Sequence, residues 1–149
     1  MRNIALVTGA SSGMGKEFVR EISKKYKGLD EIWVVARRRE RLRELKKEII
    51  GTRVRILPLD LMEEESFERL KMVLAKEQPV VRILVNASGY GISGSFEHQT
   101  EEDAAGMIHL NCEALTRIRS EDLLFIRWHL LRDLLRSRIS QFMQQPKHM

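Results

Sequence analysis

A glycine-rich turn near the start of the chain constrains its fold more than any other feature. The segment TGASSGMG occupies residues 8–15 and follows a short apolar run at residues 4–7. Beyond it, Phe18, Val19 and Ile22 recur at the spacing of one helical face. This order predicts a strand, a tight turn and a helix. The free amide N–H groups of the turn and the positive end of the helix are suited to bind an anion such as a phosphate.

Each glycine of the turn has its own expected role. Gly9 allows the backbone to turn sharply out of the strand. Gly13 allows the main chain to approach a phosphate closely, and Gly15 allows the helix to pack tightly on the strand. The hydroxyl groups of Ser11 and Ser12 can add hydrogen-bond donors. The alternative is an ordinary tight loop, but the strand before the turn and the helix after it favour an anion site.

The rest of the chain alternates between strand and helix patterns. Strands are expected at residues 3–8, 31–36, 53–57 and 81–85, and helices at residues 13–26, 39–50, 63–76 and 100–118. The strands are rich in Val, Ile and Leu without interruption, which is typical of strands covered by helices on both faces. Short links between the elements imply parallel strands with right-handed crossovers. We therefore predict an α/β fold with a Rossmann-like, doubly wound parallel sheet of about four strands.

The glycine segment, with the spacing G-x-x-x-G-x-G, closely resembles that of the short-chain dehydrogenase/reductase family. The resemblance covers residues 1–118, which we interpret as one NAD(P)-binding domain. It implies an oxidoreductase that transfers a hydride between a nicotinamide cofactor and the carbon of an alcohol or carbonyl compound.

The end of the second strand distinguishes NAD from NADP. In dinucleotide-binding folds, an acidic residue at this point accepts hydrogen bonds from the ribose 2′-hydroxyl of NAD. This chain instead has Ala36 followed by Arg37 and Arg38, whose charges would attract a 2′-phosphate. The pattern predicts NADP (NADPH) rather than NAD, with Arg37 as the first candidate contact and Arg38 as the second. The alternative is a helix that simply begins with basic residues.

Later segments match further parts of the family pattern. The resemblance places Asp60 beside the adenine ring, although Asp60 could also cap the turn into the third helix. Asn86 and Gly89 match the family's Asn-Asn-Ala-Gly motif, which implies that Asn86 organises the sheet and lines the cofactor cleft. Asn111 matches a catalytic-site asparagine that holds a water connected to the catalytic lysine. The expected cofactor-binding residues are Gly9, Ser11, Ser12, Gly13, Met14, Gly15, Arg37, Arg38, Asp60, Leu61, Asn86 and Gly89.

The other catalytic residues of the family are missing from this sequence. The family uses a tyrosine as general acid/base, a lysine four residues later and a serine on the preceding strand. The two tyrosines here, Tyr26 and Tyr90, are followed four residues later by Asp30 and Gly94. After Ala114 there is no further Ala, Gly or Val. We therefore expect a truncated or frame-shifted chain that keeps the cofactor-binding half, lacks the catalytic half and is inactive alone.

Residues 119–149 depart from the family pattern. Leu124, Trp128, Leu131 and Leu135 recur at spacings of three and four, which predicts a basic amphipathic helical tail. Such a helix could cover the exposed edge of the fourth strand. Alternatively it could bind a partner protein or a membrane surface, and the chain would then be a non-catalytic nucleotide-binding or interaction module.

Composition and charge limit the possible partners. Hydrophobic residues make up 43% of the 149 residues, yet no apolar run is long enough to span a membrane and no signal peptide precedes the first strand. The net charge is +5, but no aromatic residues interleave with the basic cluster at residues 37–47, so nucleic acid is not an expected partner. The spacing of His and Cys residues indicates no metal site. A nicotinamide dinucleotide and a possible homo-oligomer are the expected partners.

The single cysteine bears on location and packing. One cysteine cannot form an intramolecular disulfide, which suits a reducing cytoplasm. We expect Cys112 to be buried as a small apolar side chain. We also expect the helix around it to bury a broad apolar face that includes Ile108 and Leu110.

Overall fold

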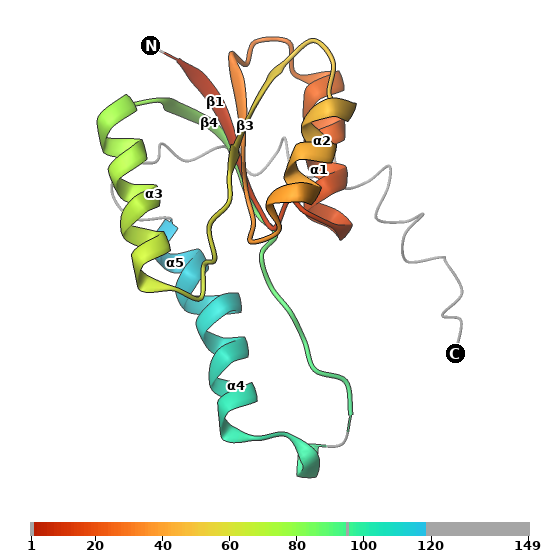
Figure 1. The fold of residues 1–149 in the computed structure, drawn as a ribbon, viewed down its shortest axis with the longest axis vertical. Helices are drawn as coiled ribbons and strands as arrows, with labels where there is room; N and C mark the ends of the chain where they lie inside the picture. The colour runs from red at the N-terminus through yellow and green to blue at the C-terminus, as the bar shows by residue number, and fades with distance from the viewer. Residues whose placement is uncertain (1, 95, 119–149) are drawn as a thin grey trace, which may run out of the picture.

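The computed structural model describes residues 2–94 and 96–118, and within them a four-stranded parallel sheet forms the centre of the fold (Figure 1). The strands are β1 (Asn3–Thr8), β2 (Glu31–Val35), β3 (Arg53–Leu57) and β4 (Val80–Asn86), in the order β3-β2-β1-β4. The helices are α1 (Gly13–Lys25), α2 (Arg39–Glu48), α3 (Glu64–Glu77), α4 (Glu101–Ile108) and α5 (Ala114–Ile118). A 3-10 turn, η1 (Phe96–His98), precedes α4, and a π-helical turn, η2 (His109–Glu113), joins α4 to α5. The predicted Rossmann-like parallel sheet is confirmed.

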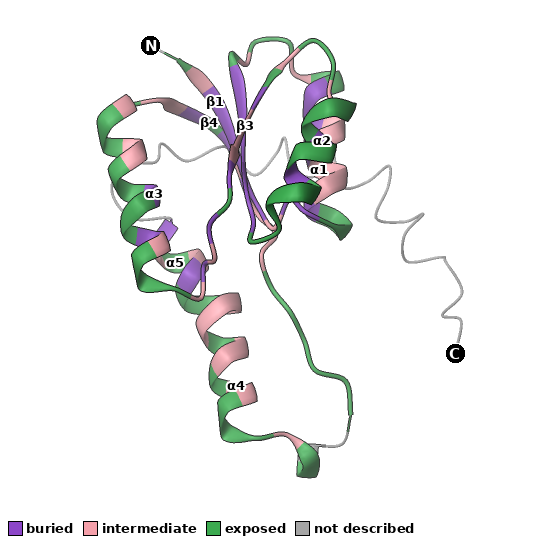
Figure 2. Ribbon diagram, in the orientation of Figure 1, coloured by how far each residue is buried: buried purple, intermediate pink, exposed green. Residues whose placement is uncertain are grey.

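Helices cover both faces of the sheet (Figures 1 and 2). On one face, Val19 of α1 and Leu42 of α2 belong to the same buried cluster as Val34 of β2. On the other face, Phe67 of α3 lies in a second cluster with Trp33 of β2. Successive residues of a strand point to opposite faces, so every position of β2 is apolar or buried because both faces are covered.

The parallel arrangement gives the sheet two chemically different ends. Thr8, the last residue of β1, pairs with Val35 on one side and with Asn86 on the other. Glu31, the first residue of β2, pairs with Arg53, the first residue of β3. All strands therefore end together at the carboxyl end of the sheet and begin together at its amino end.

The helix expected over residues 100–118 differs from its prediction. Thr100 and Asp103 form a reciprocal capping box that starts α4, and the helix then widens into the π turn before α5. α4 extends away from the sheet (Figure 1), and Ile108 at its end is 64% exposed. The prediction of a broad buried face is therefore wrong for α4, whereas Ile118 of α5 is buried in the second cluster.

Two further expectations concern the same part of the chain. Cys112 is exposed, so the prediction that it is buried is wrong, because η2 packs on the sheet less closely than α5 does. The predicted amphipathic tail at residues 119–149 lies outside the described residues. Every helix in the described part of the chain is too short or too polar to cross a bilayer.

Candidate functional site

A cavity of about 300 Å³ lies at the carboxyl end of the sheet, beside the glycine-rich turn. Parallel α/β sheets bind ligands at this end, where the order of the strands reverses. In this sheet the order reverses between β1 and β4. Of the predicted residues, the following line the cavity: Gly9, Ser11, Ser12, Gly13, Met14, Arg37, Arg38, Asp60, Leu61 and Gly89.

Three predicted residues, Gly15, Asn86 and Asn111, do not line the cavity. Five lining residues were not predicted, namely Ala36, Leu59, Ala87, Ser88 and Leu110. The first four are sequence neighbours of predicted residues, so their position in the sequence could have identified them as lining residues. Leu110 comes from η2, far along the chain, and its neighbour Asn111 was predicted from the family pattern.

The backbone of the glycine-rich turn is packed from two sides. A Cβ atom on Gly9 would lie 2.3 Å from the carbonyl oxygen of Ala87, in the loop after β4. A Cβ atom on Gly15 would lie 2.3 Å from the carbonyl oxygen of Gly9. A Cβ atom on Gly13, where φ is 53°, would meet nothing within 4 Å. Packing within the protein thus requires glycine at positions 9 and 15, whereas Gly13 leaves open space for a ligand.

The amino end of α1 contributes positive charge to the cavity. The first amide N–H groups of a helix have no partners within the helix. The side chain of Ser12, which precedes α1, makes no capping hydrogen bond, and the first turn of α1 contains no acidic residue. The positive end of the helix dipole is therefore not neutralised by the helix's own side chains.

Arg38 brings a full positive charge to the same turn. Its Nη2 atom donates to Oγ of Ser11 at 3.0 Å and to Oγ of Ser12 at 2.7 Å. The side chain of Arg37 is 71% exposed, and its Nη1 atom lies 3.7 Å from Oδ2 of Asp60. The sequence favoured Arg37 as the first contact to a 2′-phosphate. In the structure Arg38 lies at the glycine turn and Arg37 lies beside Asp60.

Asp60 has the capping geometry that was the alternative to a ligand role. Its Oδ1 atom accepts a hydrogen bond from the backbone N–H of Met62 at 3.0 Å. Its own backbone N–H donates to Oγ of Ser66 at 3.2 Å. Asp60 therefore caps the turn into α3 and lines the cavity at the same time.

Thr8 holds the loop after β4, a role that reasoning from the sequence missed. Thr8 is fully buried, and its Oγ1 atom accepts hydrogen bonds from the backbone N–H groups of Ala87 at 3.1 Å and Ser88 at 3.2 Å. A hydroxyl at the last position of an apolar strand was the available signal. Asn86 precedes this loop, and its Oδ1 atom is buried without a hydrogen-bond partner in the part of the chain that the structure describes.

Asn111 holds the same loop from the helical side. Its Oδ1 atom accepts from the backbone N–H of Tyr90 at 3.0 Å, and its Nδ2 atom donates to the carbonyl oxygen of Tyr90 at 2.8 Å. Asn111 lies in η2, and π turns are frequent at functional sites. The hydroxyl of Tyr90 lies so close to α4 that a Cβ atom on Gly106 would come within 2.4 Å of it. Asn111 thus positions the loop that carries Gly89, and its catalytic role stays a prediction.

The arrangement can bind an anion but offers little acid/base chemistry. Asp60, Arg37 and Arg38 are the ionisable side chains among the lining residues. Within residues 2–94 and 96–118, no group of three His, Cys, Asp or Glu side chains is placed to hold a metal ion.

Comparison with known proteins identifies relatives of the whole described region. Residues 3–121 match the family model of short chain dehydrogenases. The chain is 37% identical over 113 residues to a very-long-chain 3-oxoacyl-CoA reductase from Eremothecium gossypii, and the match covers 72% of this chain and 31% of the relative. It is 34% identical over 114 residues to the NADP-dependent 3-hydroxy acid dehydrogenase YdfG of Escherichia coli, and that match covers 75% of this chain and 44% of the relative.

A solved structure shows the same fold. The short-chain dehydrogenase from Sphingobium yanoikuyae in complex with NADPH matches with a TM-score of 0.69 and 31% sequence identity. The match covers 79% of this chain and 46% of that one. The chain therefore spans less than half the length of each of these three proteins.

Proposed function

This chain belongs to the short chain dehydrogenase family, and we propose that it binds NADP in the cavity at the carboxyl end of the sheet. The observation that carries the proposal is the guanidinium group of Arg38, which reaches the hydroxyl groups of Ser11 and Ser12 beside the cavity. An acidic residue that would favour the ribose 2′-hydroxyl of NAD is absent after β2, where Ala36 is followed by three arginines.

The residues of the turn fit a dinucleotide phosphate. The space beside Gly13 is open, and the uncapped amino end of α1 supplies N–H donors and a positive dipole. Arg38 adds a charge-assisted donor that suits a second phosphate group, the 2′-phosphate of NADP. Two of the proteins to which the chain is similar are described with NADP or NADPH, which supports the same choice.

We further propose that residues 1–149 bind this cofactor without catalysing its reaction. Bound NADP would supply the hydride chemistry for an alcohol and carbonyl pair. Proton transfer to the substrate oxygen needs a positioned acid/base group, which typically contributes about 10²–10⁴ in rate. Neither tyrosine of the sequence has a lysine four residues later, and the hydroxyl of Tyr90 lies against Gly106. In this form the chain is a cofactor-binding unit of an oxidoreductase.

Titration of NADPH and NADH tests the cofactor assignment. NADPH should bind more tightly than NADH, and Arg38→Ala should weaken NADPH binding by about 1.5–3 kcal/mol, the range for hydrogen bonds to charged groups. Arg37→Ala should have a smaller effect, because that side chain is largely exposed and faces Asp60. Arg43→Ala, which removes an exposed arginine paired with Glu40 on the same helix, is the matched control. Equal affinities of the wild-type protein for both cofactors would refute the assignment.

An activity assay tests the second part of the proposal. Steady-state turnover with ketones, aldehydes and secondary alcohols should not exceed background, even when NADPH binding is saturated. Robust turnover that disappears in Tyr90→Phe would show that Tyr90 acts as the proton donor and would refute the proposal.

We also propose a reducing, cytoplasmic location. The single cysteine, Cys112, is exposed and has no second cysteine in the sequence with which to pair. Such thiols persist where the cytoplasm keeps them reduced. Fractionation of cells that express the tagged chain is the test, and recovery from a secreted or periplasmic fraction would contradict it.

A further inference from the structure

The end of the sheet opposite the cavity carries a concentration of positive charge. The turns from α1 to β2, from α2 to β3 and from α3 to β4 all lie at this end, because each helix returns the chain to the start of the next strand (Figure 1). We call it the amino-end face. Its exposed cationic residues include Lys25, Lys27, Lys46, Lys47, Arg53 and Lys76.

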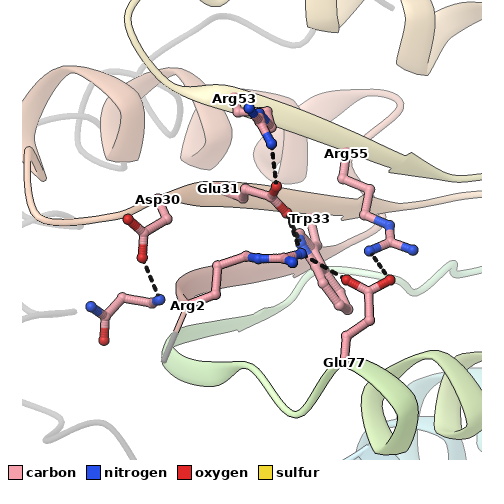
Figure 3. Close-up of polar contacts among 8 residues, drawn as sticks. Arg2, Asp30, Glu31, Trp33, Arg53, Arg55 and Glu77 are labelled. Carbon is pink, nitrogen blue, oxygen red and sulfur yellow. Dashed lines mark hydrogen bonds and ion pairs between the residues drawn. The ribbon is translucent and has the colours of Figure 1, made fainter.

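A buried carboxylate of this face is occupied by partners within the protein (Figure 3). Glu31 is 5% exposed, and one of its oxygens accepts a hydrogen bond from Nε1 of Trp33 at 2.7 Å. Arg2 and Arg53 approach the same carboxylate at 3.4 Å and 3.3 Å. These contacts satisfy Glu31 and connect the starts of β1, β2 and β3.

Two further acidic residues here are also engaged. Glu77, at the end of α3, accepts hydrogen bonds from Arg2 at 2.7 Å and from Arg55 (Figure 3). Asp30 accepts a hydrogen bond from the backbone N–H of Asn3 at 2.7 Å. These carboxylates therefore fasten the strands and α3 to one another, and they do not neutralise the lysines that point outward.

The lysines near the ends of the helices lack such partners. In the part of the chain that the structure describes, Lys27, Lys46, Lys47 and Lys76 form no ion pair with a carboxylate. Lys46 and Lys47 lie in the last turn of α2, and Lys76 lies in the last turn of α3. Their charge is therefore available to an external anionic surface.

An apolar side chain protrudes beside these lysines. Ile50, in the turn from α2 to β3, is 88% exposed, which is the largest exposed fraction among the large hydrophobic residues described. Gly51 follows with a φ of 84° and turns the chain back into β3. Ile50 thus buries almost nothing within the described fold, and its side chain can contact a partner.

We propose that the amino-end face docks on an anionic lipid surface, with its lysines facing the lipid phosphates and Ile50 entering the headgroup region. Basic residues near an anionic leaflet and an inserted apolar side chain both favour such binding. Nucleic acid would attract the same charges but offers no apolar layer for Ile50. No exposed aromatic side chain accompanies the lysines among the described residues of this face, so a base-stacking platform is lacking as well.

The docked orientation leaves the cavity accessible. The cavity lies at the carboxyl end of the sheet, so it faces solvent when the amino-end face lies on the lipid. A dinucleotide could therefore enter and leave while the protein is bound to the membrane. The docking proposal does not depend on which ligand the cavity takes.

Co-sedimentation of the 149-residue chain with lipid vesicles tests the proposal. The chain should sediment with vesicles of phosphatidylcholine and phosphatidylserine in equal amounts, but not with phosphatidylcholine alone. Raising the salt from about 0.1 M to about 1 M should release it, because the Debye length falls from about 10 Å to about 3 Å. K46E/K47E should lower the partition coefficient at least about 25-fold, since each lysine near an anionic surface contributes about fivefold.

Matched variants distinguish binding through the amino-end face from a general effect of net charge or of exposed apolar side chains. R69E/K71E changes two exposed residues in the middle of α3, lowers the net charge equally and should still bind. Ile50→Ser should weaken binding, whereas Met72→Ser, at a residue that is 61% exposed on α3, should not. All four variants should stay folded at the assay temperature because the residues are exposed, and thermal unfolding checks this. K46E/K47E removes the favourable charges of the last turn of α2, and R69E/K71E removes the ion pair of Lys71 with Glu68, so both should melt slightly below wild type. K46Q/K47Q gives a milder second test of the same two lysines.

Several outcomes would overturn the proposal. These are equal sedimentation with phosphatidylcholine alone, no sedimentation with either vesicle, and an equal loss of binding in R69E/K71E. Undiminished binding of K46E/K47E would place the lipid contact elsewhere in the chain and would refute it too. Binding of a fluorescent DNA duplex that K46E/K47E abolishes, without vesicle binding, would assign the face to nucleic acid instead.

Discussion

Replacing Gly15 with alanine would test how tightly α1 is held against the glycine turn. The added Cβ atom would lie 2.3 Å from the carbonyl oxygen of Gly9, 2.7 Å from its carbonyl carbon and 3.1 Å from the backbone nitrogen of Ala10. These neighbours are backbone atoms, so no side-chain rotation can relieve the overlap. The amino end of α1 would have to move about 1 Å away from the turn to restore an ordinary carbon–oxygen contact.

The cost of that movement follows from what α1 carries. Val19 and Ile22 on α1 are fully buried, so a shift of the helix disturbs their packing against the sheet. Overpacking a well-packed core typically costs about 1–3 kcal/mol. In a chain of this size, 1 kcal/mol corresponds to about 2–4 °C in melting temperature, so we expect a fall of about 2–12 °C.

Thermal unfolding followed by far-ultraviolet circular dichroism is the assay. Gly28→Ala is the matched control, because a Cβ atom there would meet nothing within 4 Å and its φ is not positive. That variant should melt at or slightly above the wild-type temperature, since it reduces the entropy of the unfolded chain. A Gly15→Ala protein that melts within about 1 °C of wild type would refute the packing argument based on the measured overlap.

Acid should destabilise the protein partly through Glu77, because its hydrogen bond from Arg55 lowers the pKa of the carboxyl below the ordinary 4.5. The stabilisation by ionised Glu77 is present above about pH 4.5 and is lost as the pH falls through the lowered pKa. Glu77→Gln should therefore flatten the acid side of a plot of the urea unfolding midpoint against pH, and an unchanged plot would contradict this prediction. Gly13→Val should abolish NADPH binding in a titration, because a branched side chain would fill the space for the pyrophosphate, while the helical signal in circular dichroism persists. Normal NADPH binding by this variant would place the phosphate elsewhere. Asn111→Leu should lower the free energy of unfolding by about 1–3 kcal/mol, because it removes both hydrogen bonds to the backbone of Tyr90; urea unfolding at the wild-type midpoint would show that the two bonds contribute nothing.

Most of the fold could be predicted from the sequence because its signals are local. The run of apolar residues in each strand, the helical spacing of Phe18, Val19 and Ile22, and the glycines of residues 8–15 act over a few neighbouring positions. β1 and β3 accordingly have their predicted bounds. The glycine turn and the family resemblance together identified most of the residues that line the cavity, and these residues meet because strand ends and the turns after them lie at one end of a parallel sheet.

Contacts between distant segments were decided only by the tertiary structure. Which of two adjacent arginines reaches Ser11 depends on how α2 is placed relative to the turn after β1, and the sequence ranked the two only as contacts to a 2′-phosphate. The exposure of Ile108 depends on whether another layer covers α4, and the helical pattern of its own sequence cannot report that.

The hydrogen bonds that hold the loop after β4 also depend on features that the sequence shows and on others that only the tertiary structure decides. Thr8 bonds to Ala87 across the sheet, and Asn111 bonds to Tyr90 from a helix that lies later in the chain. The residue types were visible in the sequence as a polar end to an apolar strand and a polar position in a helix. Their partners were not, because a hydrogen bond between residues many positions apart forms only where the packed backbone brings donor and acceptor within about 3 Å.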